Sequence, residues 1–193
     1  MRKTAKNRRL YPLCSATITS TVCLLVFCSC ALPKKTSDPH EKQWSVPVTL
    51  PGVPNLHKVS ATLYRSAQPT REGMKRLKDD LKIKTIINLR SFHSDRDEIS
   101  STGLTYEHIY MKTWHPEIKE VIRFINIATD PSRAPVLVHC QHGSDRTGTM
   151  CAFYRIIVEG WTREEAIREM TEGGFGFHGI WQNLIRYIND DVI

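Results

Sequence analysis

The sequence predicts an α/β protein in which helices flank a central, mostly parallel sheet. Two observations predict it. Short apolar segments rich in β-branched residues alternate along the chain with longer segments whose apolar residues recur at helical spacing. Alternation of this kind is typical of a parallel sheet with helices packed on its faces. The 193 residues are enough for one such domain and a short extension.

Four segments have the composition of β-strands. Two of them, 83–89 and 135–139, are so rich in Val, Ile and Leu that they should be buried on both faces, as the inner strands of a parallel sheet are. The expected strands are 62–65, 83–89, 104–111 and 135–139. In such sheets the loops that carry function leave the carboxyl ends of the strands.

Helices are predicted between these strands and after the last of them. Thr70 can cap one helix, Pro116 can open another, and Thr162 begins a capping box. The helical segment that follows the strand at 135–139 stops before Gly160. In chain order the expected helices are 70–80, 116–128, 147–159, one that starts after Thr162, and 181–188. The glycine-rich segment 173–179 is interpreted as a connection between the last two helices.

The N-terminal residues 1–31 have the pattern of a targeting segment. A basic stretch over 1–9 precedes an apolar run over about 14–31, which is the order found in secretory signals and also in uncleaved membrane anchors. The residues before and including Cys30 resemble a bacterial lipobox, although Phe27 stands where an aliphatic residue is usual. We therefore expect an exported or membrane-attached protein, and leave open whether Cys30 is lipidated or the segment is simply cleaved.

Residues 32–54 have the composition of a linker. They contain five prolines among Lys, Ser and Asp residues, a mixture that suits an extended spacer. The folded domain is accordingly predicted over 55–193, beginning near Asn55. The linker would hold this domain away from a membrane to which the N-terminus attaches.

The distribution of charge argues against a nucleic-acid partner. The formal net charge is +7, but seven of the 27 basic residues lie within 1–35, which contains no acidic residue. The other 20 basic residues equal the 20 acidic ones, so the rest of the chain, which contains the predicted domain, is neutral. Only two of the six cysteines, Cys140 and Cys151, lie in that domain. Their spacing fits neither a disulfide framework nor a zinc site.

The segment 138–148 contains the candidate catalytic residues. Cys140 and Arg146 are separated by five residues, between a predicted strand and a predicted helix. A loop of this length that enters a helix directs its backbone N–H groups inward, and the helix dipole adds to the resulting anion cradle. The thiolate is the nucleophilic form of cysteine, and positive charge around Cys140 favours it. The planar guanidinium of Arg146 can bind two phosphate oxygens at once.

The residues around this pair are the candidate substrate-binding groups. The loop should place backbone N–H groups and short polar side chains around a phosphate, and its glycine permits a tight turn. Thr147 can donate its hydroxyl to the thiolate or to the phosphate, and His139 can set the shape of the loop. The candidates are His139, Gln141, His142, Gly143, Ser144 and Thr147.

This string resembles the signature His-Cys-x-x-Gly-x-x-Arg-Thr-Gly of the protein tyrosine phosphatase superfamily. Segments 63–69 and 87–90 also resemble the atypical dual-specificity phosphatases of bacteria, fungi and plants. The resemblance implies the Cys-based phosphatase fold over roughly 55–190, and hydrolysis through a phosphocysteine on Cys140. It implies no metal and no cofactor. The substrate would be a phosphorylated protein or a small phosphate ester.

A proton donor for the leaving oxygen is harder to identify. The loop after the strand at 104–111 contains no Asp, and Asp130 lies at the wrong end of the sheet. Asp145, immediately before Arg146, matches the position of an acidic residue in phosphoinositide phosphatases, and we predict it as the acid. The alternative is that it stabilises the start of the helix. Further candidates for the acid are Asp95, Asp97, His115 and Glu117.

Other roles remain open at this point. Trp114 and His115 either form a wall of the pocket or pack on the edge of the sheet. Arg65 and Arg90 either line the rim of the pocket or pair with surface acids. The alternatives for the whole chain are an inositol-phosphate or phosphoinositide phosphatase, a non-catalytic phosphate-binding module, and a rhodanese-like or arsenate-reductase-like thiol enzyme.

Overall fold

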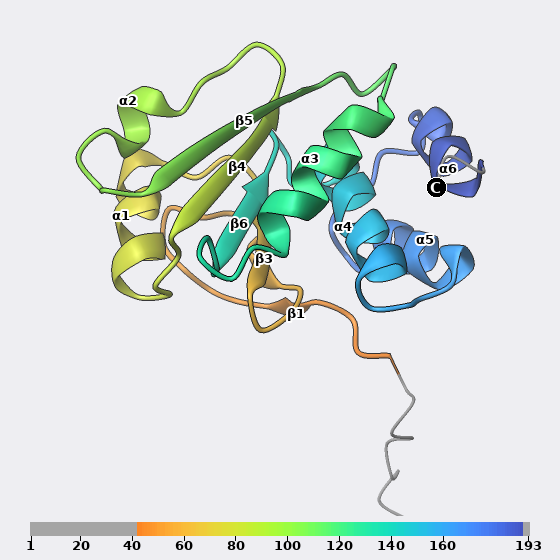
Figure 1. Ribbon diagram of the computed structural model, residues 1–193, viewed down its shortest axis with the longest axis horizontal. Coiled ribbons are helices and arrows are strands. Elements are labelled where there is room, and N and C mark those ends of the chain that lie inside the picture. Colours follow the sequence, from red (N-terminus) through yellow and green to blue (C-terminus); the bar gives the residue numbers. More distant parts are fainter. Residues whose placement is uncertain (1–41, 191–193) are drawn as a thin grey trace, which may run out of the picture. The chain divides into compact units, whose positions relative to one another are not determined.

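The computed structural model describes residues 42–190, and these form a six-stranded sheet with helices on both faces (Figure 1). The strands lie in the order β1-β2-β3-β6-β4-β5, and their bounds are Val46–Pro47 (β1), His57–Lys58 (β2), Leu63–Ser66 (β3), Thr85–Arg90 (β4), Thr105–Met111 (β5) and Val136–His139 (β6). Strands β3, β6, β4 and β5 are parallel, whereas β1 and β2 add to one edge in antiparallel pairs. The predicted α/β architecture with a mostly parallel sheet is thus confirmed.

The helices follow the predicted order with small shifts of their ends. Their bounds are Arg71–Asp79 (α1), Arg96–Ile99 (α2), Ile118–Ala128 (α3), Asp145–Ile157 (α4), Arg163–Glu172 (α5) and Gln182–Asn189 (α6). Thr70 caps α1 and Thr162 forms the capping box of α5, as expected. The short α2 had no counterpart in the sequence analysis. Helix α3 begins at Ile118 rather than at Pro116, because Glu117 serves as its cap.

The two faces of the sheet have separate apolar cores, because successive side chains of a strand point in opposite directions. Ile87 and Val138 belong to the core that α3, α4, α5 and α6 cover. Ile86 and Leu137 belong to the smaller core beneath α1 and α2. The inner strands β4 and β6 are therefore buried on both faces, which explains their nearly continuous apolar sequence.

The folded domain begins before Asn55, so the predicted linker over 32–54 is too long at its C-terminal end. Strand β1 pairs with β2, and the backbone N–H and hydroxyl of Ser45 both donate to the buried carboxylate of Glu169, at 2.6 and 2.9 Å. Val53 is buried in the core beneath α1. The prolines in this segment suggested a spacer. The apolar residues between them nevertheless pack against the domain.

The predicted targeting segment 1–31 and the first part of the linker lie outside the described residues. Within residues 42–190, none of the helices combines the length and apolar character that a membrane span requires.

Candidate active site

The loop between β6 and α4 lies at the carboxyl end of the central strands. Strand β6 runs between β3 and β4 and ends at His139, and α4 begins at Asp145. Cys140 follows the strand directly and is 2% exposed. The 13-residue helix α4 starts two residues earlier than predicted, so Arg146 lies in its first turn. The positive end of the helix dipole therefore faces the segment that contains Cys140.

A cavity of about 200 Å³ opens beside this loop. Gln141, within the loop, and Arg146, in the first turn of α4, both line this cavity. The other lining residues come from the ends of β4 and β5 and the segments that follow them, and are Arg90, Ser91, Phe92, Met111, Thr113 and Trp114. Two guanidinium groups and no carboxylate line this cavity, so it suits an anion.

Two aromatic side chains at the cavity are unusually exposed. Phe92 is 88% exposed and Trp114 is 60% exposed, although both line the cavity. Trp114 thus forms part of the wall, whereas His115 does not line the cavity and its backbone pairs with that of Lys112 in a turn. Exposed aromatic faces beside a cavity that suits an anion can hold a flat organic group.

Arg65 holds the backbone of the loop through a buried hydrogen bond. Its side chain is 1% exposed, donates from Nη2 to the carbonyl oxygen of Gly143 at 2.7 Å, and lies 3.7 Å over the ring of Phe175. Arg65 therefore neither lines the rim nor pairs with a surface acid. The sequence could not reveal this position, because nothing in it distinguishes a buried arginine from an arginine at the surface. Arg90 instead lines the cavity.

Gly143 is required where the loop turns. Its φ is 75°, and a Cβ at this position would lie 2.6 Å from the backbone of Ser66 and Ala67. Ser144 is buried and donates its hydroxyl to the carbonyl oxygen of Phe175 at 2.8 Å. The segment 173–179 is thus more than a connection, since it packs against the loop.

The remaining candidates of the loop have different surroundings. His142 is exposed, and its ring lies 5.4 Å from that of His178. Thr147 is fully buried, and its hydroxyl has no hydrogen-bond partner among residues 42–190. A buried hydroxyl without a partner is costly, which is consistent with the predicted contact to the thiolate or to bound phosphate. Cys151 lies deeper in α4, where burial raises the pKa of its thiol to about 11.

The carboxylate of Asp145, the predicted acid, is hydrogen-bonded to His178. Oδ1 accepts from the backbone N–H of His178 at 2.9 Å, and Oδ2 lies 2.9 Å from Nδ1 of its ring. The side chain of Asp145 is 10% exposed, whereas that of His178 is 49% exposed. Asp145 directly precedes Arg146 in the chain. Its carboxylate, however, is hydrogen-bonded to the 173–179 segment and not to the cavity wall.

The other candidate acids do not line the cavity. Asp95 is fully buried and accepts from His139 Nε2 at 2.7 Å and from Gln68 Nε2 at 2.8 Å. Asp97 is exposed on α2, and Glu117 forms the cap of α3. The contact between Asp95 and His139 was not anticipated, because the two residues are 44 positions apart.

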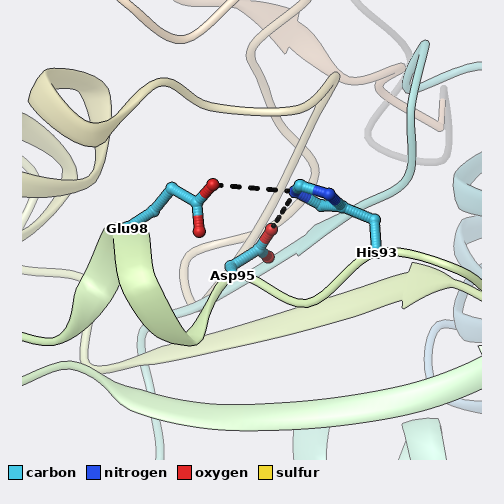
Figure 2. Close-up of side chains that lie close together, drawn as sticks. All are labelled: His93, Asp95 and Glu98. Atoms are coloured by element: carbon cyan, nitrogen blue, oxygen red, sulfur yellow. Dashed lines mark ion pairs between the residues drawn. The ribbon is translucent and has the colours of Figure 1, made fainter.

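One group of side chains has the donor types of a metal site. His93, Asp95 and Glu98 offer atoms that all lie within 4.8 Å of one another, and Figure 2 shows the three side chains directed towards each other. His93 Nε2 is 3.3 Å from Asp95 and 3.7 Å from Glu98. Both oxygens of Asp95 also accept hydrogen bonds, one from Gln68 and one from His139.

Comparison with known proteins connects this geometry to a family. Residues 52–185 match the family model described as DSP-PTPase phosphatase fused to NAD+ kinase. The dual specificity protein phosphatase TpbA of Pseudomonas aeruginosa strain UCBPP-PA14 is 36% identical over 160 residues, which are 80% of this chain and 69% of TpbA. TpbA of strain PAO1 is 38% identical over 140 residues, which are 69% of this chain and 61% of that protein.

A solved structure agrees with the sequence comparison. The crystal structure of a Cys-to-Ser variant of P. aeruginosa TpbA in complex with pTyr superposes with a TM-score of 0.69 at 30% identity. The match covers 78% of this chain and 91% of the solved one.

Proposed function

We propose that this chain, which belongs to the DSP-PTPase family of Cys-dependent phosphatases, removes phosphate from phosphotyrosine in proteins. The family makes it a phosphatase with a phosphocysteine intermediate, and the substrate is the proposal. One observation carries it. The loop that contains Cys140 and Arg146 borders a cavity that combines two guanidinium groups with the exposed rings of Phe92 and Trp114.

The proposed reaction has two steps. The thiolate of Cys140 attacks phosphorus, the bond from phosphorus to the leaving oxygen breaks, and that oxygen takes a proton. Water then attacks the phosphocysteine, releasing inorganic phosphate and the thiolate. Arg146 binds two non-bridging oxygens throughout, together with the backbone N–H groups of the loop. We keep Asp145 as the proposed proton donor, supported by its position immediately before Arg146.

Phosphotyrosine fits the cavity better than a phosphorylated aliphatic residue. A phenyl ring can lie against Phe92 or Trp114, whereas a serine or threonine side chain has no ring that could make this contact. The named relative TpbA has been solved with pTyr, which supports the same class of substrate. An inositol or lipid phosphate would use Arg90 and Arg146 but would leave the two rings without a role.

A panel of substrates tests the proposal on the full chain. Matched peptides with phosphotyrosine or phosphoserine, soluble inositol phosphates, and phosphoinositides in detergent micelles are compared by release of inorganic phosphate. We expect the highest kcat/KM for the phosphotyrosine peptide. Preference for an inositol or lipid phosphate would overturn the substrate assignment, and binding without turnover of any substrate would identify a phosphate-binding module.

We also propose that residues 1–31 direct the protein out of the cytoplasm, followed by a linker that reaches no further than residue 41. The support is the basic stretch, the apolar run and the small residues around Cys30. Fractionation of cells that express the full chain, beside a chain starting at Ser37, tests this. If both proteins are found in the cytoplasm, the proposal fails. Mass spectrometry of the mature N-terminus distinguishes lipidation at Cys30 from simple cleavage.

A further inference from the structure

A continuous chain of hydrogen bonds connects the cavity wall to the nucleophile. Arg90, which lines the cavity, donates from Nη1 to Gln68 Oε1 at 2.9 Å. Gln68 Nε2 donates to Asp95 Oδ1 at 2.8 Å, and Asp95 Oδ2 accepts from His139 Nε2 at 2.7 Å. His139 directly precedes Cys140. Three segments that are distant in sequence, at 68, 90–95 and 139, thus meet behind the loop.

Both ring nitrogens of His139 face hydrogen-bond acceptors. Nδ1 lies 3.2 Å from the carbonyl oxygen of Cys140, which can only accept. Nε2 faces the carboxylate of Asp95, which also accepts. Two acceptors around one ring favour the form that carries a proton on both nitrogens. The ring is 0% exposed, and the buried carboxylate compensates the charge of that form.

Asp95 is correspondingly ionised. Burial opposes its ionisation, but the hydrogen bonds and charge of His139, together with the bond from Gln68, hold the pKa of this carboxyl below its usual range. Two further groups around it are His93, whose Nε2 lies 3.3 Å from Oδ1, and Glu98 beyond His93 (Figure 2). The hydroxyl of Tyr106 accepts from the backbone N–H of Asp95. His93 and Glu98 are partly exposed, so the inner pair of Asp95 and His139 is the one shielded from water.

We propose that Asp95 and Gln68 are positioning residues of the reaction, which hold a doubly protonated His139 against the peptide of Cys140 and the guanidinium of Arg90 against the cavity. This inference rests on the proposed phosphatase function. Neither side chain lines the cavity, so both act through their neighbours. A positive charge that is fixed behind the loop favours the thiolate of Cys140. Because this charge is already in place, the protein need not rearrange when charge moves during the reaction.

Replacing Asp95 by Asn tests the first half of the proposal, because the shape is kept but the charge that supports the imidazolium is lost. The readout that does not depend on turnover is alkylation of Cys140 by iodoacetamide at pH 6, followed on the Cys140 peptide of the full chain by mass spectrometry. Only the thiolate reacts. We expect Asp95→Asn to slow alkylation by about tenfold, which corresponds to one pH unit in the thiolate equilibrium, and to lower kcat more than it raises KM.

Glu169→Gln is the matched control. Glu169 is also a buried carboxylate, 2% exposed and bonded to Arg155 Nε at 2.7 Å, but it anchors Ser45 rather than the loop. We expect this variant to lose stability while alkylation of Cys140 and kcat stay within about twofold of the wild type. If Asp95→Asn behaves in the same way, its role is only structural and the proposal is wrong.

Gln68→Ala tests the second half, and this test does not depend on whether Asp95→Asn folds. It leaves the pair of Asp95 and His139 intact but releases Arg90. We expect KM for a phosphotyrosine peptide to rise about fivefold or more with a smaller change in kcat, since one charged hydrogen-bond partner loses its orientation. Unchanged KM would overturn the role of Gln68. A wild-type chain that hydrolyses no phosphoester would refute the proposed function instead, and alkylation of Cys140 would still test the positioning role of Asp95.

Discussion

The imidazole of His139 lies 2.7 Å from the carboxylate of Asp95, and neither side chain is exposed. Asp95 entered the sequence analysis as one of several candidate acids. In the structure it lies behind the loop and accepts a hydrogen bond from His139, the residue before Cys140. It therefore supports the loop instead. The network therefore explains how a carboxylate near the active site can contribute without touching the substrate.

The pair of Asp95 and His139 makes stability depend on pH in a defined direction. Because the pKa of Asp95 is lower in the folded protein, its contribution is complete above the unfolded pKa of about 3.9 and is lost as the pH falls through the folded pKa. We expect Asp95→Asn to reduce the free energy of unfolding by roughly 3 kcal/mol at pH 6. The difference from wild type should shrink below about pH 4, as measured by urea unfolding. A difference that does not change between pH 6 and pH 3 would contradict the assignment.

Cys140→Ser should abolish turnover while binding of phosphate survives. The hydroxyl is not ionised at neutral pH, whereas the backbone N–H groups of the loop and Arg146 remain in place. Phosphate release from a phosphotyrosine peptide and calorimetric binding of the same peptide measure the two properties. Cys151→Ser is the matched control, because that thiol is buried and its pKa is raised to about 11. Turnover of Cys140→Ser near the wild-type rate would rule out the nucleophile assignment.

Arg146→Lys should be nearly as damaging although the charge is kept. A lysine ammonium is a point charge and cannot reproduce two parallel N–H donors to two phosphate oxygens. We expect kcat/KM to fall by about 10²-fold or more, the loss that follows from one or two charged hydrogen bonds. Arg186→Lys, on α6 and outside the cavity lining, serves as the control. An unchanged rate in Arg146→Lys would remove the clamp from the mechanism.

The sequence was sufficient for the parts of this site that lie close together along the chain. Strand β6, the loop and α4 are contiguous, so the spacing of Cys140 and Arg146 and the apolar run before them revealed all three at once. The supporting residues could not be found in this way. Arg65 and Asp95 reach the loop only after β3 and β4 have paired with β6, and their burial depends on that pairing. The strands β1 and β2 have two residues each, too few for a periodic pattern.

The exposed rings at the cavity should determine the preference for aryl phosphates. Trp114→Ala and Phe92→Ala should each raise KM for a phosphotyrosine peptide by roughly 2- to 10-fold, the value of one aromatic contact. The matched phosphoserine peptide should be much less affected. Tyr110→Ala is the control, because this ring is also exposed, at 61%, but lies on β5 outside the cavity lining. Equal effects on both peptides would show that the rings shape the cavity without contacting the substrate ring.

Asp145→Asn separates a proton donor from a structural carboxylate. If Asp145 protonates the leaving oxygen, the variant should slow hydrolysis of esters with poor leaving groups by about 10²-fold or more. Activated aryl phosphates, whose leaving group needs no proton, should be affected much less. We expect this pattern in a series of aryl phosphates of increasing phenol pKa.

The contact with His178 supplies the decisive control for that experiment. His178→Ala removes the ring that lies 2.9 Å from the Asp145 carboxylate, but keeps the backbone N–H that donates to this carboxylate and leaves the carboxyl group in place. If Asp145 is the acid, His178→Ala should not reproduce the dependence on the leaving group, because a carboxyl group is still available to donate. If both variants lose the same rate on every ester of the series, Asp145 acts by holding the 173–179 segment against the loop. The proton must then come from another group.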